Sequence, residues 1–506
     1  MTTPNESYEF NVNLSSIEGI VWNENFLTDT NISNVKKWLK NPMIFNKEIR
    51  YLSNQLYNSN GVYTNVVDYM VSIPTLDRVI YSLNKNHSRF KKNKQLFIES
   101  LNKMKDKIIT RDILHKLAIE GISFAYFEVN ENKRFAEGFI GDDEIDNIYE
   151  LNAKFNCSVI SLPTDYCKIV GTKNSSYVIA FDMSYFDQFF SNGLSKKLRR
   201  YPKEIRDKYK QYTKNRNKKW AILDNNKTIV NKVRSSRDER WGRPIGLAAF
   251  VDILYDEYFV DTKRNVLDEV NSTIIYQTFP EGDKKGTSSL TQKQQKTQHN
   301  NIKNALFSRG FRRGVNFFSV AAGTKLDKLE TNIEILKTDG EKELLKRIAT
   351  DLGFAGSALN GEDSNFSSQQ MNIELVTREV LTWLEQIQEE YNKVINANII
   401  KDPQCYVQMY YIPTTIANQD KFIRHMKELY TQGRGSLQAW IAATGFNPDA
   451  YLALMDEELE EDFENKYPVH RISYTMSGES GRPSESNPTN ENTIKSKTNN
   501  NKPRPS

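Results

Sequence analysis

Apolar residues recur at three- and four-residue spacing along residues 371–398, the longest such pattern in the chain. This repeat is that of an amphipathic helix, and at 1.5 Å per residue it predicts a helix roughly 40 Å long. Asp402-Pro403 follows. We expect the helix to end there, because a proline disfavours helical geometry in the residue before it. The apolar positions are Ile373, Val376, Val380, Leu384, Ile387, Tyr391 and Val394.

Two shorter segments precede this helix. Residues 339–352 form an amphipathic pattern that begins at a capping residue, Asp339, and ends at Gly353, so a second helix is predicted there. The loop 354–370 consists mainly of Gly, Ala, Ser and Asn with a few acids, and no Lys or Arg occurs between Arg347 and Arg378. A long helix next to a loop without positive charge is typical of an architectural part rather than of a catalytic site.

The N-terminal half combines helices with strands. Core-like spacing of apolar residues predicts helices within residues 32–81 and 94–121, and a further helix covers 202–214. Alternation with the two-residue period of a strand predicts an α+β arrangement, with strands at 122–129, 166–170, 176–182, 220–223 and 228–230.

Another long helix is predicted from residue 241 to about residue 269. Pro244 suits its first turn, because the N–H that proline lacks would have no partner there. One face of this helix is marked by Ile245, Ala248, Val251, Tyr255, Tyr258, Thr262 and Val266. A compact β-rich insertion, residues 273–337, follows, with a strand at 274–279, a turn at 280–286, a helix at 292–306 and strands at 315–320 and 332–336. Two long helices therefore bracket a small β module.

The C-terminal part begins with a strand at 406–412. Glycine- and proline-containing breaks then separate three predicted helices at 419–431, 436–444 and 448–463. Residues 464–506 end in a stretch of Ser, Asn, Thr, Pro, Gly and Lys with almost no hydrophobic residues, so we expect a disordered polar tail.

Composition limits the class of protein. With 506 residues the chain has room for about three domains, and its net charge is only +5. No run of about eighteen apolar residues and no secretory signal is present, so neither a membrane span nor export is expected. Three scattered cysteines fit free thiols in a reducing cytoplasm. Charge is uneven, because residues 82–116 and 196–219 are basic and residues 455–464 are acidic, which indicates either solvated helix faces or contact with phosphate backbones.

Motifs of enzymatic chemistry are missing from the sequence. No P-loop, no dinucleotide-binding glycine pattern and no nucleophile elbow occurs, and the five histidines are isolated. Asp182, Asp187, Asp252 and Asp256 lie among aromatic residues, but scattered acids are a weak nuclease signal. We expect no catalytic residue, no metal and no cofactor. The loop 354–370 is either an ordinary surface connection or a lining for a polyanion that must move, since Ser, Asn and Gln contact phosphates without holding them tightly.

In the order of its parts, the chain resembles the portal proteins, or head-to-tail connectors, of long-tailed bacteriophages. Trp241-Gly-Arg-Pro-Ile-Gly246 resembles the entry to the first stem helix of that family, and residues 166–170 with 180–186 resemble its wing strands. The implied modules are a wing (1–240), stem helix 1 (241–272), clip (273–338), stem helix 2 (339–352), tunnel loop (353–370), spine helix (371–402), wing strand and helical crown (403–463) and disordered polar tail (464–506).

This resemblance implies a mainly helical α+β fold in a non-enzymatic subunit of a cyclic ring, expected to be a dodecamer. Double-stranded DNA would pass through the ring without sequence recognition during packaging and ejection. The expected protein partners are the major capsid protein, the terminase large subunit, a head-completion adaptor and a scaffolding protein, with no membrane. The location would be the portal vertex of the virion, after assembly in the cytoplasm of the host bacterium.

Particular residues follow from the same resemblance. The tunnel lining would consist of Ser357, Asn360, Ser364, Asn365, Ser367, Ser368 and Gln369. The docking surface of the clip would consist of Asp283, Lys284, Lys285 and His299. Two alternatives stay open: a DNA-processing enzyme, such as a nuclease or replication protein, that uses the basic residues 196–219, and another structural virion protein, such as a capsid or neck component.

Overall fold

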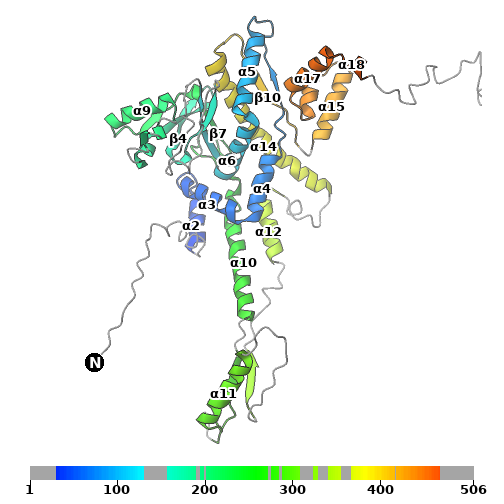
Figure 1. The fold of residues 1–506 in the computed structure, drawn as a ribbon. Coiled ribbons are helices and arrows are strands. Elements are labelled where there is room, and N and C mark those ends of the chain that lie inside the picture. The colour runs from blue at the N-terminus through cyan, green and yellow to red at the C-terminus, as the bar shows by residue number, and fades with distance from the viewer. Residues whose placement is uncertain are drawn as a thin grey trace, which may run out of the picture. The chain divides into compact units, whose positions relative to one another are not determined.

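The computed structural model describes residues 30–129, 157–189, 194–195, 197–198, 201–271, 275–283, 288–307, 323–328, 340–354, 366–415 and 418–467. Within these residues the fold is mainly helical with small sheets, so the expected α+β class is confirmed (Figure 1). The chain divides into two compact units. One comprises Met1–Leu76 and Ile80–Gln419, and the other comprises Asp77–Val79 and Asp420–Ser506.

The N-terminal helices build the first core. Asn60 separates α3 from α4, and its side-chain oxygen accepts a hydrogen bond from the Tyr63 N–H at 3.0 Å, which caps α4. Gly121 ends α6 with a φ of 74°, a left-handed conformation that glycine adopts without strain. The helices predicted in this region are confirmed as α2 (Thr30–Lys40), α3 (Asn46–Ser59), α4 (Gly61–Ser72), α5 (Phe90–Met104) and α6 (Asp106–Glu120). The prediction is wrong at its end, because the last residues of the range 32–81 form the strand β1 (Arg78–Tyr81).

Strand β2 (Ile122–Glu128) separates two hydrophobic cores and is buried on both faces. Its side chains alternate, as the two-residue period of a strand requires. Phe127 joins the core of the N-terminal helices, whereas Phe124 and Tyr126 join a second, aromatic-rich core. In the order β3-β2-β7 the strands are antiparallel, and so are those of the sheet β4-β5-β6. The bounds are β3 (Ser158–Ser161), β4 (Cys167–Lys173), β5 (Ser176–Asp182), β6 (Trp220–Ile222) and β7 (Thr228–Lys232), with α9 at Lys203–Lys214.

The first long helix, α10, covers Phe250–Asn271 and begins later than the predicted residue 241. The segment 241–244, which was predicted to be helical, lies against the end of β7 instead. There the Arg243 N–H donates to the Val233 carbonyl at 3.1 Å. At Gly242 a Cβ atom would lie 1.8 Å from the Gly121 carbonyl oxygen, so only glycine fits this approach. A short 3-10 turn, η4 (Ile245–Leu247), leads into the helix.

The apolar face that the sequence marks on α10 is buried at its start, at Ile245, but not along the rest of the helix. Tyr255 and Tyr258 are 41% and 56% exposed, whereas Phe250, Ile253 and Leu254 are buried. The ring of Phe250 packs edge-on against Tyr63 with 6.1 Å between centroids, so the stripe that begins at Phe250 faces the core.

The β-rich insertion is described in part. Strand β8 (Ile275–Thr278) pairs antiparallel with β9 (Lys325–Lys328), and α11 (Gln292–Phe307) confirms the predicted helix. The sequence did not predict β9, because Lys-Leu-Asp-Lys has no apolar alternation. The strands predicted at 315–320 and 332–336 lie outside the described residues.

After the insertion the chain returns in α12 (Gly340–Asp351), which agrees with the predicted short helix. The long helix α14 covers Phe366–Ile395 and so begins five residues before the predicted start. No Gly or Pro occurs between Gly361 and Pro403, so nothing in the sequence stops the helix from extending into the expected loop. A π-helical turn, η6 (Asn396–Ile400), ends it, and the strand β10 (Gln408–Tyr411) follows.

The second unit contains the C-terminal helices. They are α15 (Gln419–Thr431), α16 (Leu437–Ala443), α17 (Pro448–Glu460) and α18 (Phe463–Lys466), where a single last helix to residue 463 was predicted. Asp462, with a left-handed φ of 55°, interrupts that last helix. The N-termini of α16 and α17 are capped by Ser436 and Asn447. The predicted disordered tail lies outside the described residues, apart from its first residues up to 467.

Candidate channel, docking and interface surfaces

The two helices that bracket the β-rich insertion, α10 and α12, lie side by side (Figure 1). The Nε atom of Arg347 on α12 lies 2.8 Å from the Oδ2 atom of Asp252 on α10. Burial, together with a hydrogen bond to Asp252, raises the pKa of Asp351, and Arg347 partly opposes this rise. The contact between the helices therefore brings the carboxyl groups of Asp252 and Asp351 beside one guanidinium group, that of Arg347.

The candidate tunnel residues fall into two groups. Ser357, Asn360, Ser364 and Asn365 lie outside the described residues. Ser367, Ser368 and Gln369 lie in the N-terminal part of α14, not in a loop as predicted.

The candidate docking residues of the β-rich insertion are also only partly described. Asp283 is exposed, and His299 lies exposed on α11. Lys284 and Lys285 lie outside the described residues.

Arg234 connects α14 to the turn η4, which precedes α10. Its Nε and Nη2 atoms bind the two carboxylate oxygens of Glu379 at 2.6 and 2.9 Å, and Nη1 donates to the Ile245 carbonyl at 2.7 Å. Such two-pronged pairing fixes orientation as well as distance. Arg234 has a φ of 51°, an unusual left-handed conformation for a residue other than glycine.

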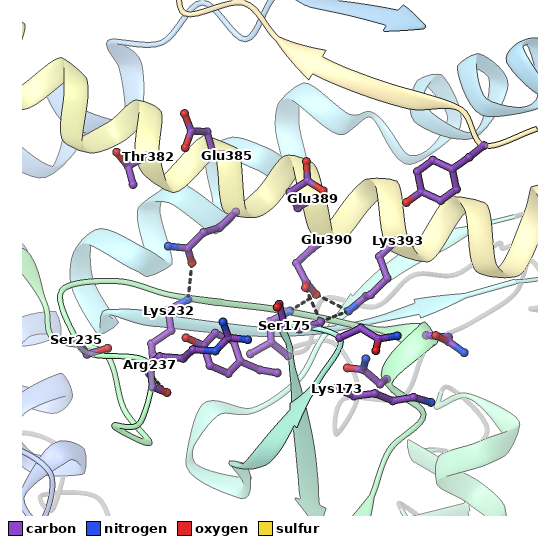
Figure 2. A pocket seen from close by; sticks show the side chains of 18 residues that line it. Lys173, Ser175, Lys232, Ser235, Arg237, Thr382, Glu385, Glu389, Glu390 and Lys393 are labelled. Carbon is purple, nitrogen blue, oxygen red and sulfur yellow. Dashed lines mark hydrogen bonds and ion pairs between the residues drawn. The ribbon is translucent and has the colours of Figure 1, made fainter. Parts of the chain in front are cut away.

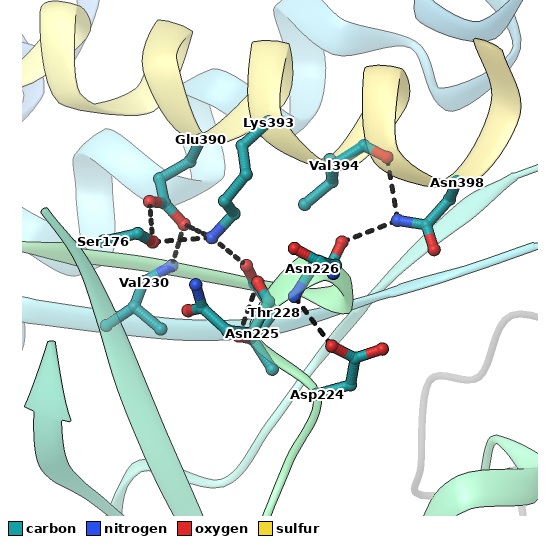
Figure 3. A network of polar contacts seen from close by, with 10 residues as sticks. All are labelled: Ser176, Asp224, Asn225, Asn226, Thr228, Val230, Glu390, Lys393, Val394 and Asn398. Atoms are coloured by element: carbon teal, nitrogen blue, oxygen red, sulfur yellow. Dashed lines mark hydrogen bonds and ion pairs between the residues drawn. The ribbon is translucent and has the colours of Figure 1, made fainter. Parts of the chain in front are cut away.

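A buried ion pair joins α14 to both sheets (Figure 3). The Nζ atom of Lys393 donates to Glu390 at 2.7 Å, to Ser176 at 2.7 Å and to the Thr228 carbonyl at 2.8 Å, so all three of its donors are used. Glu390 also accepts from the Ser176 hydroxyl at 2.6 Å and from the Val230 N–H at 3.1 Å. Burial lowers the pKa of Lys393, and Glu390 opposes this effect. Both charged side chains have hydrogen-bond partners on β5 and β7, so this network, called the joint below, fixes α14 to the two sheets.

A polar hollow of about 750 Å³ opens beside this joint, between α14 and the hairpin of β4 and β5 (Figure 2). Glu385 and Glu389, one turn apart on α14, are exposed, whereas Lys232 is held by backbone carbonyls of the segment 236–239. This hollow was not predicted from the sequence, in which only the four-residue spacing of Glu385 and Glu389 indicates a shared helix face. Its lining residues are Lys173, Asn174, Ser175, Ser176, Tyr177, Asn225, Asn226, Val230, Lys232, Ser235, Arg237, Thr382, Glu385, Gln386, Glu389, Glu390, Lys393 and Tyr406.

A row of side-chain amides on α14 and η6 forms hydrogen bonds with one backbone edge of β10, as a neighbouring strand would. Asn392 accepts from the Met409 N–H at 2.8 Å and donates to the Met409 carbonyl at 3.2 Å. Asn396 does the same for Val407, at 3.1 and 2.6 Å, and Gln388 accepts from the Tyr411 N–H at 2.8 Å. The four-residue spacing of these amides along the helix matches the two-residue spacing of the strand, and it is the only trace of this contact in the sequence.

The basic residues 196–219 are partly paired. Glu204 lies 2.5 Å from Lys208 and accepts from the Tyr126 hydroxyl at 2.7 Å. Asp187 binds the Tyr212 hydroxyl at 2.5 Å, which raises the pKa of Tyr212 to about 12. Lys210 pairs with Asp207 at 3.5 Å, yet its side chain is 76% exposed.

Two of the acids considered as a weak nuclease signal make structural contacts. Asp182 caps the turn η2 (Met183–Gln188) and pairs with Lys219 at 3.1 Å, whereas Asp252 faces α12. Across the described part of the chain, no group of three or more His, Cys, Asp or Glu side chains could hold a metal ion. None of the helices described here is long and apolar enough to span a bilayer. Cys157, Cys167 and Cys405 are buried free thiols, as predicted, and burial raises the pKa of Cys157 to about 11.

The chain is similar in sequence to a prophage-derived protein. No family model matches the chain. The SPbeta prophage-derived uncharacterized protein YonE of Bacillus subtilis (strain 168) is 24% identical over 504 residues, which cover 95% of this chain and 92% of that protein.

Among solved structures, the fold is similar to those of particle necks and of a phage portal protein. A chain in the neck of the native gene transfer agent particle, computed with C12 symmetry, matches with a TM-score of 0.45 and 11% identity over 77% of this chain and 92% of its own length. A chain in the virion of that particle matches with a TM-score of 0.43 and 10% identity, covering 76% and 88% of the two chains. The HK97-family phage portal protein from Corynebacterium diphtheriae matches with a TM-score of 0.33 and 12% identity, covering 71% and 94%.

Proposed function

We propose that this protein is a phage portal subunit, a non-enzymatic protein that forms a ring at one vertex of a capsid. Double-stranded DNA passes through the ring during packaging and ejection. Contacts to the DNA are made through the backbone of the duplex and carry no sequence information.

One observation supports this proposal above the others, namely the path of the chain around the β-rich insertion. The chain runs out along α10, forms β8, α11 and β9, and returns along α12 beside α10. It then enters the 30-residue helix α14, which is tied to both wing sheets by Glu390 and Lys393. A stem, a clip, a second stem helix and a spine in this order are the modules that portal proteins have.

The modules assign roles to the surfaces. In this proposal the clip, residues 273–338, carries Asp283, Lys284, Lys285 and His299 toward the terminase large subunit and later toward the head-completion adaptor. The segment before α14 lines the channel with Ser357, Asn360 and Ser364 and continues into the start of that helix. The wing contacts the major capsid protein, and a scaffolding protein assists assembly.

The proposed ring is a dodecamer in the virion. Such a ring forms when one face of each subunit binds a different face of the next subunit and the rotation closes the circle. Twelve copies of the 58.7 kDa chain would have a mass of about 0.7 MDa.

Mass photometry and negative-stain imaging of the purified protein test the proposal. Closed rings with a central channel are the expected result, and a folded chain that stays monomeric at micromolar concentration would contradict it. Divalent-metal-dependent cleavage of DNA without rings would instead favour the DNA-processing enzyme, for which the exposed Lys210 side of α9 is the basic surface.

A further inference from the structure

The helices of the second unit leave large apolar side chains uncovered. No residue of α15 is buried, and the only buried residue of α17 is Pro448. Leu454 and Leu459 on α17 are 55% and 72% exposed, and Leu429 on α15 is 43% exposed. The buried side chains of α16 are Ile441, Ala442 and Ala443, which form only a small core for the described helices of this unit. Neighbouring exposed apolar side chains mark surfaces that bind a partner.

The exposed residues of α17 form one stripe. Tyr451, Leu454, Met455, Glu458 and Leu459 follow the spacing i, i+3, i+4, i+7 and i+8, which places them on one face of a helix. This is the pattern by which a helix normally packs against another helix, and here all five side chains are exposed. A helix that packs on this face would bury most of the apolar surface of α17.

The charges of α15 and α17 are opposite. Helix α17 has five acidic and no basic residues, whereas α15 has three basic and two acidic residues and also His425. Two α17 helices packed against each other would bring acids together, which opposes a symmetric pair. Packing of α17 against α15 brings acids to bases. It also uses two different faces of the unit, as a cyclic ring requires.

We propose that the stripe on α17 of one subunit packs against α15 of the next subunit in the ring. The occupant of this surface is thus a second copy of the same chain. The inference rests on the proposed ring, and it adds the surface that closes the contact between neighbouring C-terminal units.

Two leucine substitutions test the apolar part of the contact. Leu454→Ser combined with Leu459→Ser should raise the protein concentration at which half the chains are assembled at least about tenfold, because each loses apolar area from the contact. Leu83→Ser is the matched control, since Leu83 is 90% exposed and lies outside the proposed surface, and it should assemble like the parent. Circular dichroism of the dissociated chains should show unchanged helix content and melting.

Charge reversal tests the pairing of the two helices. Asp456→Lys with Glu458→Lys should weaken assembly, and so should Lys421→Glu with Lys427→Glu. A chain that carries all four changes should assemble more readily than either double variant, because opposite charges then face each other again with their signs exchanged. If α17 packed against α17 instead, reversing only the acids of α17 would still leave like charges facing each other. Reversing the α15 lysines would then have no effect on assembly.

The outcomes separate this inference from the proposed function. If the parent forms rings and the double-serine variant assembles at the same concentration, the surface is wrong while the ring stands. A double-serine variant that melts earlier as a dissociated chain would show that the stripe is covered within its own subunit, which also overturns the inference. If the parent forms no rings at all, the proposed function fails.

Discussion

Substitution of Asn392 by leucine is the most direct test of how α14 holds the strand that follows it. Asn392 is 1% exposed, and its side chain supplies both the acceptor for the Met409 N–H at 2.8 Å and the donor for the Met409 carbonyl at 3.2 Å. Leucine has a similar size but can form neither bond. The substitution therefore leaves two buried backbone groups without partners while the volume of the side chain hardly changes.

The magnitude follows from those two groups. An unpaired buried donor or acceptor costs about 1–3 kcal/mol, so the loss of both bonds in Asn392→Leu should lower the free energy of unfolding by about 2–6 kcal/mol. Asn392→Asp keeps an acceptor for the Met409 N–H and loses the donor to the carbonyl. Glu389→Gln, at an exposed position of the same helix, should change the free energy of unfolding by no more than about 0.5 kcal/mol.

Amide hydrogen exchange gives the local readout, and urea unfolding gives the global one. The Met409 amide should exchange faster in Asn392→Leu, by a factor that corresponds to the lost stability, whereas in Asn392→Asp it should keep more of its protection. If the Met409 amide of Asn392→Leu exchanges at the parental rate, the side-chain amides do not act as a strand partner and the reasoning is wrong.

Three other predictions concern the channel, the clip and the stem. In the proposed ring, Ser364→Lys adds a belt of positive charge that binds DNA phosphates, so this variant should assemble normally but slow DNA packaging, most strongly at low salt. The control Ser364→Asn should behave like the parent. An unchanged packaging rate of Ser364→Lys at low salt would mean that this segment does not touch DNA. Lys284→Glu with Lys285→Glu should weaken binding of the terminase or adaptor while rings still form, and unchanged binding with normal packaging would count against the clip assignment. The pKa of Asp351 is raised above 3.8 in the folded protein, so the folded state binds more protons than the unfolded chain between 3.8 and the raised value. The stability contributed by the α10–α12 contact should therefore fall as pH rises through this window, and the amides of α12 should exchange faster. Asp351→Asn should remove this pH dependence. If the pH dependence persists in Asp351→Asn, another group titrates.

The periodicity of the sequence was enough to predict most elements. Strand β5 at Ser176–Asp182 and helix α15 at Gln419–Thr431 have the bounds that alternation and three-to-four spacing predicted. Helix α14 was predicted together with its buried face, because Val376, Val380, Leu384 and Ile387 are buried as expected. These features depend on neighbours within a few residues along the chain, and local patterns record them.

The candidate site was predicted less completely. The sequence indicated the polar segment before α14, but it did not show that Ser367, Ser368 and Gln369 belong to the helix. The hollow beside Glu390 was missed because its walls come from the β4–β5 hairpin, the region around β7, and α14. These segments are far apart in the chain.

Tertiary structure alone decided which face of a helix is buried and which polar groups meet. Helix α10 carries two apolar stripes, and the one with Phe250, Ile253 and Leu254 is buried, whereas Tyr255 and Tyr258 of the stripe marked in the sequence are exposed. Arg234 and Glu379 are separated by 145 residues, and Ser176 and Lys393 by 217. The sequence by itself determined the local elements, because backbone preference and apolar spacing act over short distances. The joints between them required the folded chain, because hydrogen bonds and ion pairs depend on distances in space that residue spacing does not record.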